Sequence, residues 1–227
     1  MLEVLYEDNH LIAINKKSGD IVQGDKTGDA PLSDFVKAYI KKKYNKVGEV
    51  FLGTIHRLDR PTSGIVLYAR TSKALTRMNK QFREKQVQKT YWAVVDNTPP
   101  NNSGTLKNCL QKNQKQNKSY VTKNKVGKHA VLDYILLKKL DNFYHLEIKP
   151  KTGRHHQIRV QLAHIGCIIK GDLKYGAKRS NKDASIHLLA QKLEFIHPVK
   201  KEPITIVAPA PKDSVWEALS KSYPRPK

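Results

Sequence analysis

The chain has 227 residues, with 42 Lys and Arg against 20 Asp and Glu, so its formal net charge is +22. This length suits one large domain with a sizeable core, and we expect a single domain over residues 1–227. Such a positive excess opposes compaction and indicates a polyanionic partner, with nucleic acid first and an acidic membrane surface second.

A membrane-spanning segment is excluded, because apolar runs such as 65–69 fall far short of the ~20 residues that a helix needs. The N-terminus carries Glu3, Glu7 and Asp8, the wrong charge for a signal or transit peptide. Only two cysteines occur, Cys109 and Cys167, which are too few for a disulfide framework. We therefore expect a cytoplasmic protein with no membrane partner.

The first half of the chain predicts strands and helices in alternation. Polar residues 7–9 indicate a turn between two short strands within 2–15, and further strands are expected over 51–58, 65–70 and 89–96. Helices are expected over 29–45, where Leu32, Phe35, Val36, Tyr39 and Ile40 share a face, and over 71–85, where Ser72 can cap the helix.

A lysine-rich segment, residues 107–128, follows. No acid occurs between Asp96 and Asp133, and the segment contains Lys107, Lys112, Lys115, Lys118, Lys123, Lys125 and Lys128. Two interpretations remain open for these cations: a solvated surface, or a ribbon that contacts phosphates.

The second half predicts strands around one helix. Strands are expected in 131–137, 143–149, 167–170, 185–198 and 202–211. Ile158, Leu162 and Ile165 have helical spacing, and Gly166 can end that helix. Without a regular βαβ rhythm, this order indicates an α+β fold with a mixed, largely antiparallel sheet and flanking helices.

The stretch HRLDRPTSG, residues 56–64, places Asp59 between Arg57 and Arg60. An Asp in a turn often only binds nearby backbone, but adjacent cations favour an ionised carboxylate. Such a carboxylate can bind a metal or act as a nucleophile or base. No second acid lies in the stretch and the arginines compete with a metal, so covalent or base chemistry is favoured.

Five stretches, in chain order, resemble motifs of the RluA-type RNA pseudouridine synthases. HRLDRPTSG resembles the family signature, HRLD followed by two residues and TSG. The others are INKKSG (14–19), KTYWAVV (89–95), KTGRHHQIRVQLAHIG with GDLKYG (151–166 and 171–176), and LLAQKLEFIHP (188–198). The resemblance covers residues 2 to about 210.

The resemblance implies an RNA-uridine isomerase that needs no cofactor and no metal. Asp59 would be the catalytic aspartate, Tyr91 would stack on the base and help remove its C5 proton, and Arg159 would pair with Asp59. His56 and Arg57 would open the RNA and hold the flipped nucleotide. Leu188 would line the uracil pocket.

General chemistry supports these implied roles. Uracil in stacked RNA hides its reactive atoms, so the nucleotide must be extruded, and an aromatic such as Tyr91 can offset part of that cost. Arg159 falls at the edge of the predicted apolar stripe, where a half-buried guanidinium needs an anion. Arg154, near the start of the helix, is a candidate for substrate RNA or only a surface residue.

Other polar residues near this helix are given no chemistry. His155 and His156 would diverge by ~100° on a helix and have no third ligand, so no metal is expected. We interpret Asp172 and Tyr175 as turn and packing residues.

The chain departs from the family pattern at four positions, which affects substrate-side details. Lys17 stands in place of proline, Pro61 in place of an acid, and Gln161 and Leu189 in place of histidines. We expect no separate S4-type RNA-binding domain, so RNA contacts fall to the catalytic domain and its lysine-rich segment.

The expected partner is RNA, either 23S ribosomal RNA or transfer RNA, with no DNA and a monomeric protein. Two alternatives differ in class: a non-catalytic RNA-binding protein on this fold, and a nucleic-acid glycosylase with a lone Asp.

Overall fold

The computed structural model describes residues 2–24, 28–123 and 126–220. The described residues form two compact units: those within 1–89 and 190–209 form unit 1, and those within 90–189 and 210–227 form unit 2. The chain changes unit within two strands, β5 (Gln88–Val95) and β10 (Leu188–Ile196). The predicted α+β class with a largely antiparallel sheet is confirmed, whereas the domain count stays a prediction.

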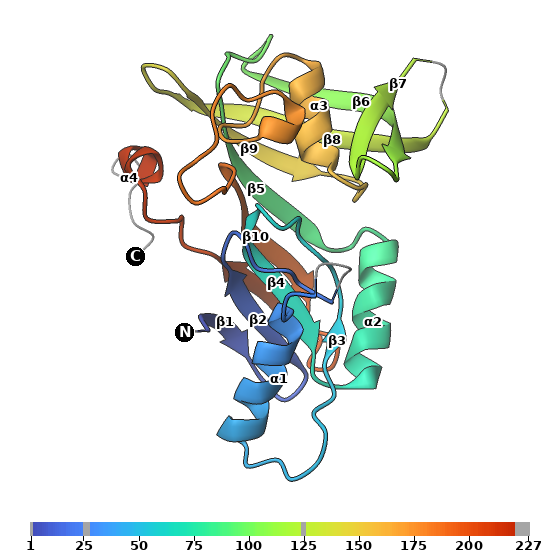
Figure 1. The fold of residues 1–227 in the computed structure, drawn as a ribbon. Helices are drawn as coiled ribbons and strands as arrows, with labels where there is room; N and C mark the ends of the chain where they lie inside the picture. The colour runs from blue at the N-terminus through green and yellow to red at the C-terminus, as the bar shows by residue number, and fades with distance from the viewer. Residues whose placement is uncertain (1, 25–27, 124–125, 221–227) are drawn as a thin grey trace. The chain divides into compact units, whose positions relative to one another are not determined.

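Unit 1 is built on the strand order β1-β2-β4-β10, with β3 paired to β4 and β11 paired to β10. The bounds are β1 Val4–Glu7, β2 Leu11–Lys16, β3 Gly53–Thr54, β4 Ser63–Ala69 and β11 Pro203–Val207. The helix α1 (Leu32–Lys43) covers one face of β2 and β4 (Figure 1), where Val36 and Ile40 pack against Ile14 and Val66.

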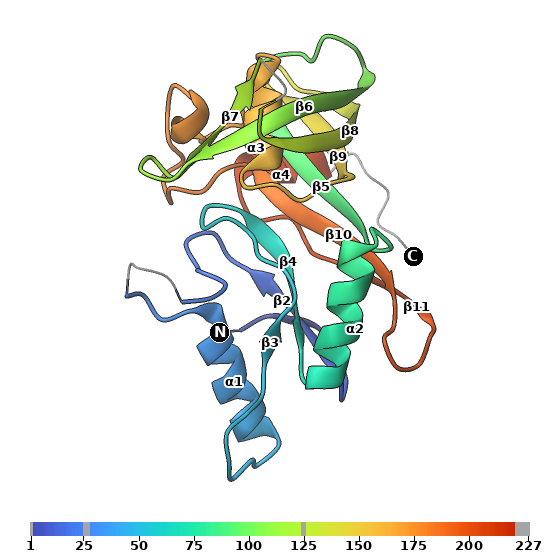
Figure 2. The same ribbon diagram turned by 90° about the vertical axis from the view of Figure 1, so that its right-hand side faces the viewer.

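The helix α2 (Ser72–Arg83) lies beside β3 and β4 (Figure 2). Its N-cap is Thr71, whose side chain accepts a hydrogen bond from the Ala74 amide, so the predicted cap at Ser72 is wrong by one residue. Gln81 and Arg77 donate to the main-chain oxygens of Ile196 and Pro198, which ties α2 to the end of β10.

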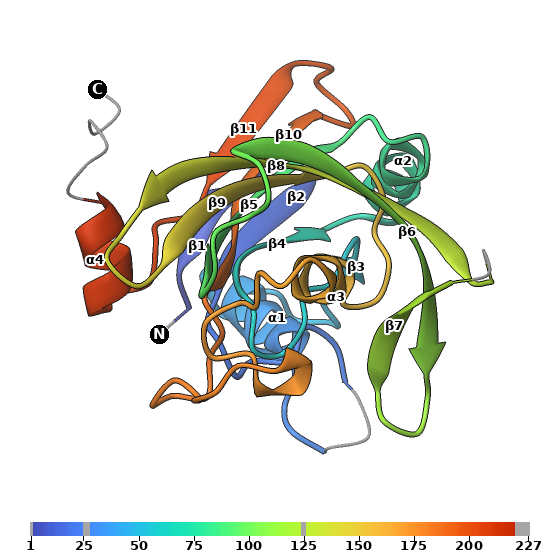
Figure 3. The ribbon, with the colours of Figure 1, turned by 90° about the horizontal axis from the view of Figure 1, so that it is seen from above.

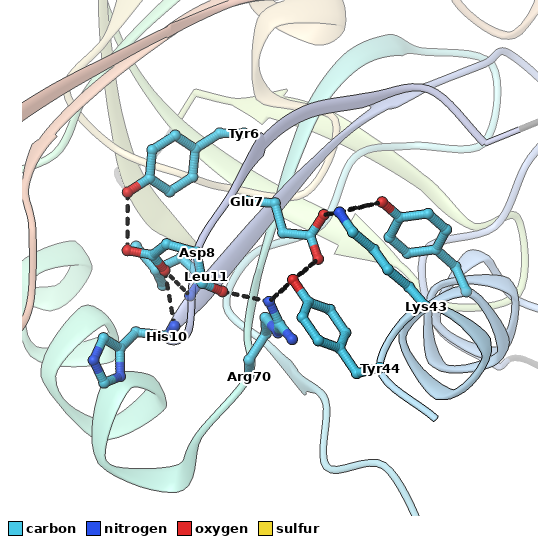
Figure 4. Close-up of polar contacts among 9 residues, drawn as sticks. Tyr6, Glu7, Asp8, His10, Leu11, Lys43, Tyr44 and Arg70 are labelled. Carbon is cyan, nitrogen blue, oxygen red and sulfur yellow. Dashed lines mark hydrogen bonds and ion pairs between the residues drawn. The ribbon is translucent and has the colours of Figure 1, made fainter. Parts of the chain in front are cut away.

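A polar cluster joins α1 to the turn between β1 and β2. The Glu7 carboxylate accepts from Tyr39, Lys43, Tyr44 and Arg70, and Arg70 also donates to the Asp8 main-chain oxygen (Figure 4). Because every donor already has this acceptor, the cluster stabilises unit 1 and offers no vacant site.

Unit 2 has the strand order β5-β9-β8-β6-β7. The bounds are β6 Ser103–Asn113, β7 Lys118–Thr122, β8 Lys128–Lys139 and β9 Tyr144–Pro150. The helix α3 (Gln157–His164) lies under the curved strands β6 and β8 (Figure 3) and contacts β7. Leu132, Leu146, Ile148 and Leu162 form the core between them.

Two short helices complete unit 2: the 3-10 helix η1 (Leu173–Tyr175) and the helix α4 (Ser214–Ser220). Trp216 of α4 is buried and stacks on His187, with ring centroids 5.5 Å apart. The buried His145 ring meets Trp92 and Trp216 edge to face. These rings attach α4 to the sheet.

Two predicted strands and one predicted core position are corrected. The strand over 51–58 is only Gly53–Thr54, because the next ladder position on β4 is taken by a side chain: the Leu67 amide donates to His56 Nε2. Residues 167–170 form no strand and only an isolated bridge from Ile169 to Val95. Phe35, expected on the apolar face of α1, is 58% exposed.

Among the residues whose structure is described, no helix is long and apolar enough to cross a membrane.

Candidate active site

The loop between β3 and β4 carries His56, Arg57 and Asp59. A turn closes it, in which the Thr62 amide donates to the Asp59 main-chain oxygen at 3.0 Å. Arg57 is exposed and Asp59 is half-buried, so the carboxylate lies partly accessible on a loop between two strands.

Lys16, the last residue of β2, stabilises this loop through its side chain. Its Nζ donates to the main-chain oxygens of Lys17 at 2.9 Å, Arg60 at 3.0 Å and Thr62 at 2.8 Å. The residue is 1% exposed, and its three N–H donors match three acceptors. Burial lowers the pKa of Lys16 to about 8, while Asp20 and Asp59 favour its charged form, so it is an ammonium at neutral pH.

The turn that follows β2, which contains Ser18 and Gly19, donates two further hydrogen bonds to the same loop. The Gly19 amide donates to the Arg60 oxygen at 2.9 Å, and Ser18 Oγ donates to the Pro61 oxygen at 3.2 Å. The Arg60 side chain turns outward to Asp29, 2.7 Å away.

Gly64 allows the loop to enter β4. Its φ is +110°, and a Cβ there would collide with the main-chain oxygen of Ala190 in β10. Only glycine combines that conformation with so close an approach.

His56 has a structural function at the start of the loop. Its ring stacks on Phe82 of α2 at 5.2 Å, and its Nε2 accepts from the Leu67 amide at 3.1 Å. Burial, with a smaller contribution from Lys89, lowers the pKa of His56 to about 3, so the ring is neutral. Its predicted contact with RNA stays a prediction.

Arg159 lies in unit 2, on α3, and is 4% exposed rather than half-buried as predicted. Its Nε donates to Asp172 Oδ2 at 2.7 Å and its Nη2 donates to Asp172 Oδ1 at 2.8 Å. The anion that its burial requires is therefore supplied within unit 2, in this two-bond geometry. The pairing of Arg159 with Asp59 stays a prediction.

Tyr175 adds a second support. Its ring lies 5.1 Å from the Arg159 guanidinium carbon, and its hydroxyl accepts from the Ser119 amide at 2.9 Å. The same hydroxyl lies 2.9 Å from His156 Nδ1. Burial, then the charge of Arg159, lowers the pKa of His156 to about 2, so this ring is neutral as well.

The two histidines before α3 are arranged differently from the prediction. The helix starts at Gln157, and His156 has a φ of +53°, so the 100° divergence does not apply. The rings of His155 and His156 stack with centroids 3.8 Å apart. In the described part of the chain, no group of three or more His, Cys, Asp or Glu is arranged to hold a metal ion.

Tyr91 and Leu188 are brought together. Leu188 is buried in the core cluster that includes Ile158 and Leu162 of α3, and Tyr91 packs against the same cluster. Arg154 is exposed, with Nε donating to the His129 oxygen at 3.0 Å, and it precedes α3 rather than starting it.

The described part of the lysine-rich segment includes the end of β6, the strand β7 and the first residue of β8. Lys107, Lys112 and Lys115 are exposed, whereas Lys118 lies over the rings of Tyr120 and Tyr175, at 5.4 and 5.1 Å. The predicted Lys125 lies outside the described residues.

The motif-based predictions missed three residues: Lys16, Asp172 and Tyr175. Asp172 and Tyr175, interpreted as turn and packing residues, also hold Arg159. A signal existed for Asp172, because a buried arginine needs an anion and Asp172 is the next acid along the chain. No comparable signal marked Lys16, because two of its three acceptors are main-chain oxygens 44 and 46 residues away.

Comparison with known proteins defines the class. The sequence profile of the RNA pseudouridylate synthase family matches residues 10–164, so the chain belongs to that family and is an RNA pseudouridine synthase, an isomerase.

Curated relatives agree with this class, and a solved structure shares the fold. The chain is 34% identical over 225 residues to a ribosomal large subunit pseudouridine synthase D of Xylella fastidiosa, covering 93% of this chain and 67% of that one. It is 33% identical over 242 residues to a tRNA pseudouridine synthase C of Haemophilus influenzae, covering 98% of each. Human RNA pseudouridylate synthase domain containing 4 has the same fold, with a TM-score of 0.79 at 24% identity over 96% of this chain and 92% of that one.

Proposed function

We propose that the chain converts a specific uridine of ribosomal or transfer RNA to pseudouridine, with Asp59 as the catalytic aspartate acting on a flipped nucleotide. The observation that carries this proposal is the family match over residues 10–164, which contains Asp59, Tyr91 and Arg159. The names of the relatives supply the two RNA classes.

The chemistry is a rearrangement without a co-reactant. Asp59 attacks C1′ or removes a ribose proton, and the N1–C1′ bond breaks. The detached uracil turns and C5 bonds to C1′. On the first route this breaks the bond between C1′ and Asp59, and on the second route Asp59 returns its proton to the ribose. The C5 proton then leaves and N1 takes up a proton. Atoms and electrons balance, so no cofactor is needed.

The roles of the other residues follow from their chemistry. Tyr91 stacks on the flipped base, which partly offsets the cost of extrusion. Leu188 provides an apolar wall, and Arg159 pairs with the Asp59 carboxylate. Arg57, Arg154 and the exposed lysines of the lysine-rich segment contact phosphates. We infer a monomer that acts on RNA in the cytoplasm and not on DNA.

The test is RNA labelled with tritium at uracil C5. Isomerisation releases tritium and leaves the strand intact, whereas a glycosylase frees the base and a pure binding protein releases nothing. Asp59→Asn should abolish release while RNA affinity stays within about twofold. Retained turnover in this variant would refute the assignment.

A further inference from the structure

The surroundings of Arg159 point to residues beyond those that the motifs single out. Arg159 is 4% exposed, and both of its hydrogen bonds to Asp172 are short, at 2.7 and 2.8 Å. Two parallel bonds to one carboxylate fix the plane of a guanidinium as well as its position. Asp172 is itself 1% exposed, so this pair is well shielded from water.

Tyr175 attaches this pair to a strand. The Tyr175 ring lies over the Arg159 guanidinium at 5.1 Å, and the Tyr175 hydroxyl is bonded to the main chain of Ser119 in β7 and to His156. Asp172 and Tyr175 belong to one short turn, closed by the Tyr175 amide donating to the Asp172 oxygen at 3.1 Å. A single turn therefore holds the arginine by a carboxylate and by an aromatic ring.

The turn also reaches the lysine-rich segment. The ammonium group of Lys118, which neighbours Ser119 on β7, lies 5.1 Å from the centre of the Tyr175 ring. Lys174 donates to the Asn117 oxygen at 3.2 Å, in the turn before β7. The same few residues thus touch both Arg159 and the strand expected to meet RNA.

We propose that Asp172 and Tyr175 are positioning residues that fix the Arg159 guanidinium for the isomerisation. This inference rests on the proposed function, in which Arg159 acts on Asp59. Neither residue need touch substrate, because each acts through Arg159. A shift of the guanidinium by about 1 Å is enough to lower turnover on the order of 100-fold.

The experiment compares kcat and KM for tritium release in single and double variants. Asp172→Asn keeps one acceptor but removes the charge, and Tyr175→Phe keeps the ring but removes the hydroxyl. We expect kcat to fall about 30- to 100-fold for Asp172→Asn and about 10-fold for Tyr175→Phe, with KM within about threefold.

Double variants with Arg159→Lys separate positioning from general damage. Arg159→Lys alone should lower kcat about 100-fold. If Asp172 and Tyr175 act only through Arg159, adding either change to Arg159→Lys lowers kcat no further. If the fold-losses in kcat of the single variants instead multiply in the double variants, the inference is overturned. It is also overturned if Asp172→Asn has the parental kcat.

A matched control is Tyr68→Phe, which removes another buried tyrosine hydroxyl, bonded to the Val22 oxygen at 3.0 Å. This control should keep the parental kcat, and circular dichroism checks the folding of every variant. If Asp172→Asn fails to fold, the kcat of Tyr175→Phe, alone and combined with Arg159→Lys, still tests the inference. If Arg159→Lys alone has the parental kcat, the role of Arg159 in the proposed function fails, which is distinct from a failure of its positioning.

Discussion

The ammonium group of Lys16 lies 2.8 Å from the main-chain oxygen of Thr62, although 46 residues separate the two in sequence. Thr62 closes the turn that begins at Asp59. The end of β2 therefore fixes the position of the loop that carries the aspartate.

Replacing Lys16 with Met should damage both stability and turnover. The three oxygens that Lys16 binds lose their donor, which costs about 2–4 kcal/mol of unfolding free energy. We expect a fall in kcat of about 100-fold as the loop shifts. Urea unfolding and tritium release measure the two effects. The control is Lys17→Met, at an exposed neighbour. If both variants lost equal unfolding free energy and equal kcat, Lys16 would have no special role in positioning the loop.

Acid should destabilise the protein through its neutral buried histidines. The pKa of His56 is lowered to about 3 and that of His156 to about 2, below the ordinary value of 6.5. The unfolded chain therefore binds more protons below pH 6.5, and the unfolding free energy falls as pH falls, by about 1.4 kcal/mol per pH unit for each ring.

The check is urea unfolding at pH 7 and pH 5. His56→Gln should lose about 2 kcal/mol less than the parent between these pH values, because one titrating ring is gone. His164→Gln, at an exposed position, should follow the parent. If the unfolding free energy of His56→Gln changes with pH as much as that of the parent, the His56 ring is not held neutral in the folded protein.

Gly64 and Gly19 offer a matched pair of substitutions. Both have positive φ, at +110° and +92°, but a Cβ at Gly64 collides with Ala190 whereas one at Gly19 meets nothing within 4 Å. Gly19→Ala should cost about 1–2 kcal/mol from the backbone alone. Gly64→Ala should cost at least about 3 kcal/mol. Equal thermal shifts would mean that β4 and β10 move apart without penalty.

The exposed lysines of the lysine-rich segment should set the salt dependence of RNA binding. Changing Lys107, Lys112 and Lys115 to Gln should reduce the slope of log K against log salt by ~0.7–0.9 for each phosphate that the variant no longer neutralises. Filter binding over a salt series measures the slope. The control changes Lys41, Lys42 and Lys46, which are exposed around the end of α1. An unaltered slope in the first variant would leave the segment as solvated surface.

The sequence predicted the elements whose periodicity reflects burial. The helix expected over 29–45 is α1, Leu32–Lys43, and Gly166, with a φ of +81°, follows α3 as expected. The strand over 51–58 failed because periodicity does not reveal that a side chain, His56, takes the ladder bond of Leu67.

Residue type and motif singled out Asp59 from the sequence, and its catalytic role stays a proposal. The site was not predictable where a side chain binds main-chain oxygens, which look alike in every sequence, as for Lys16. The burial of Arg159 was underestimated because α3 is buried on nearly all sides from Gln157 to Leu162, so a helical wheel shows no polar face.

The aromatic rings that attach α4 have a spectroscopic consequence. Both tryptophans of the chain, Trp92 and Trp216, belong to unit 2 and contact His145. Tryptophan emission, excited selectively, therefore monitors only that unit, while far-ultraviolet dichroism monitors both. Melting curves from the two signals coincide only if the loop bearing Asp59 and the helix bearing Arg159 lose their structure in one cooperative event.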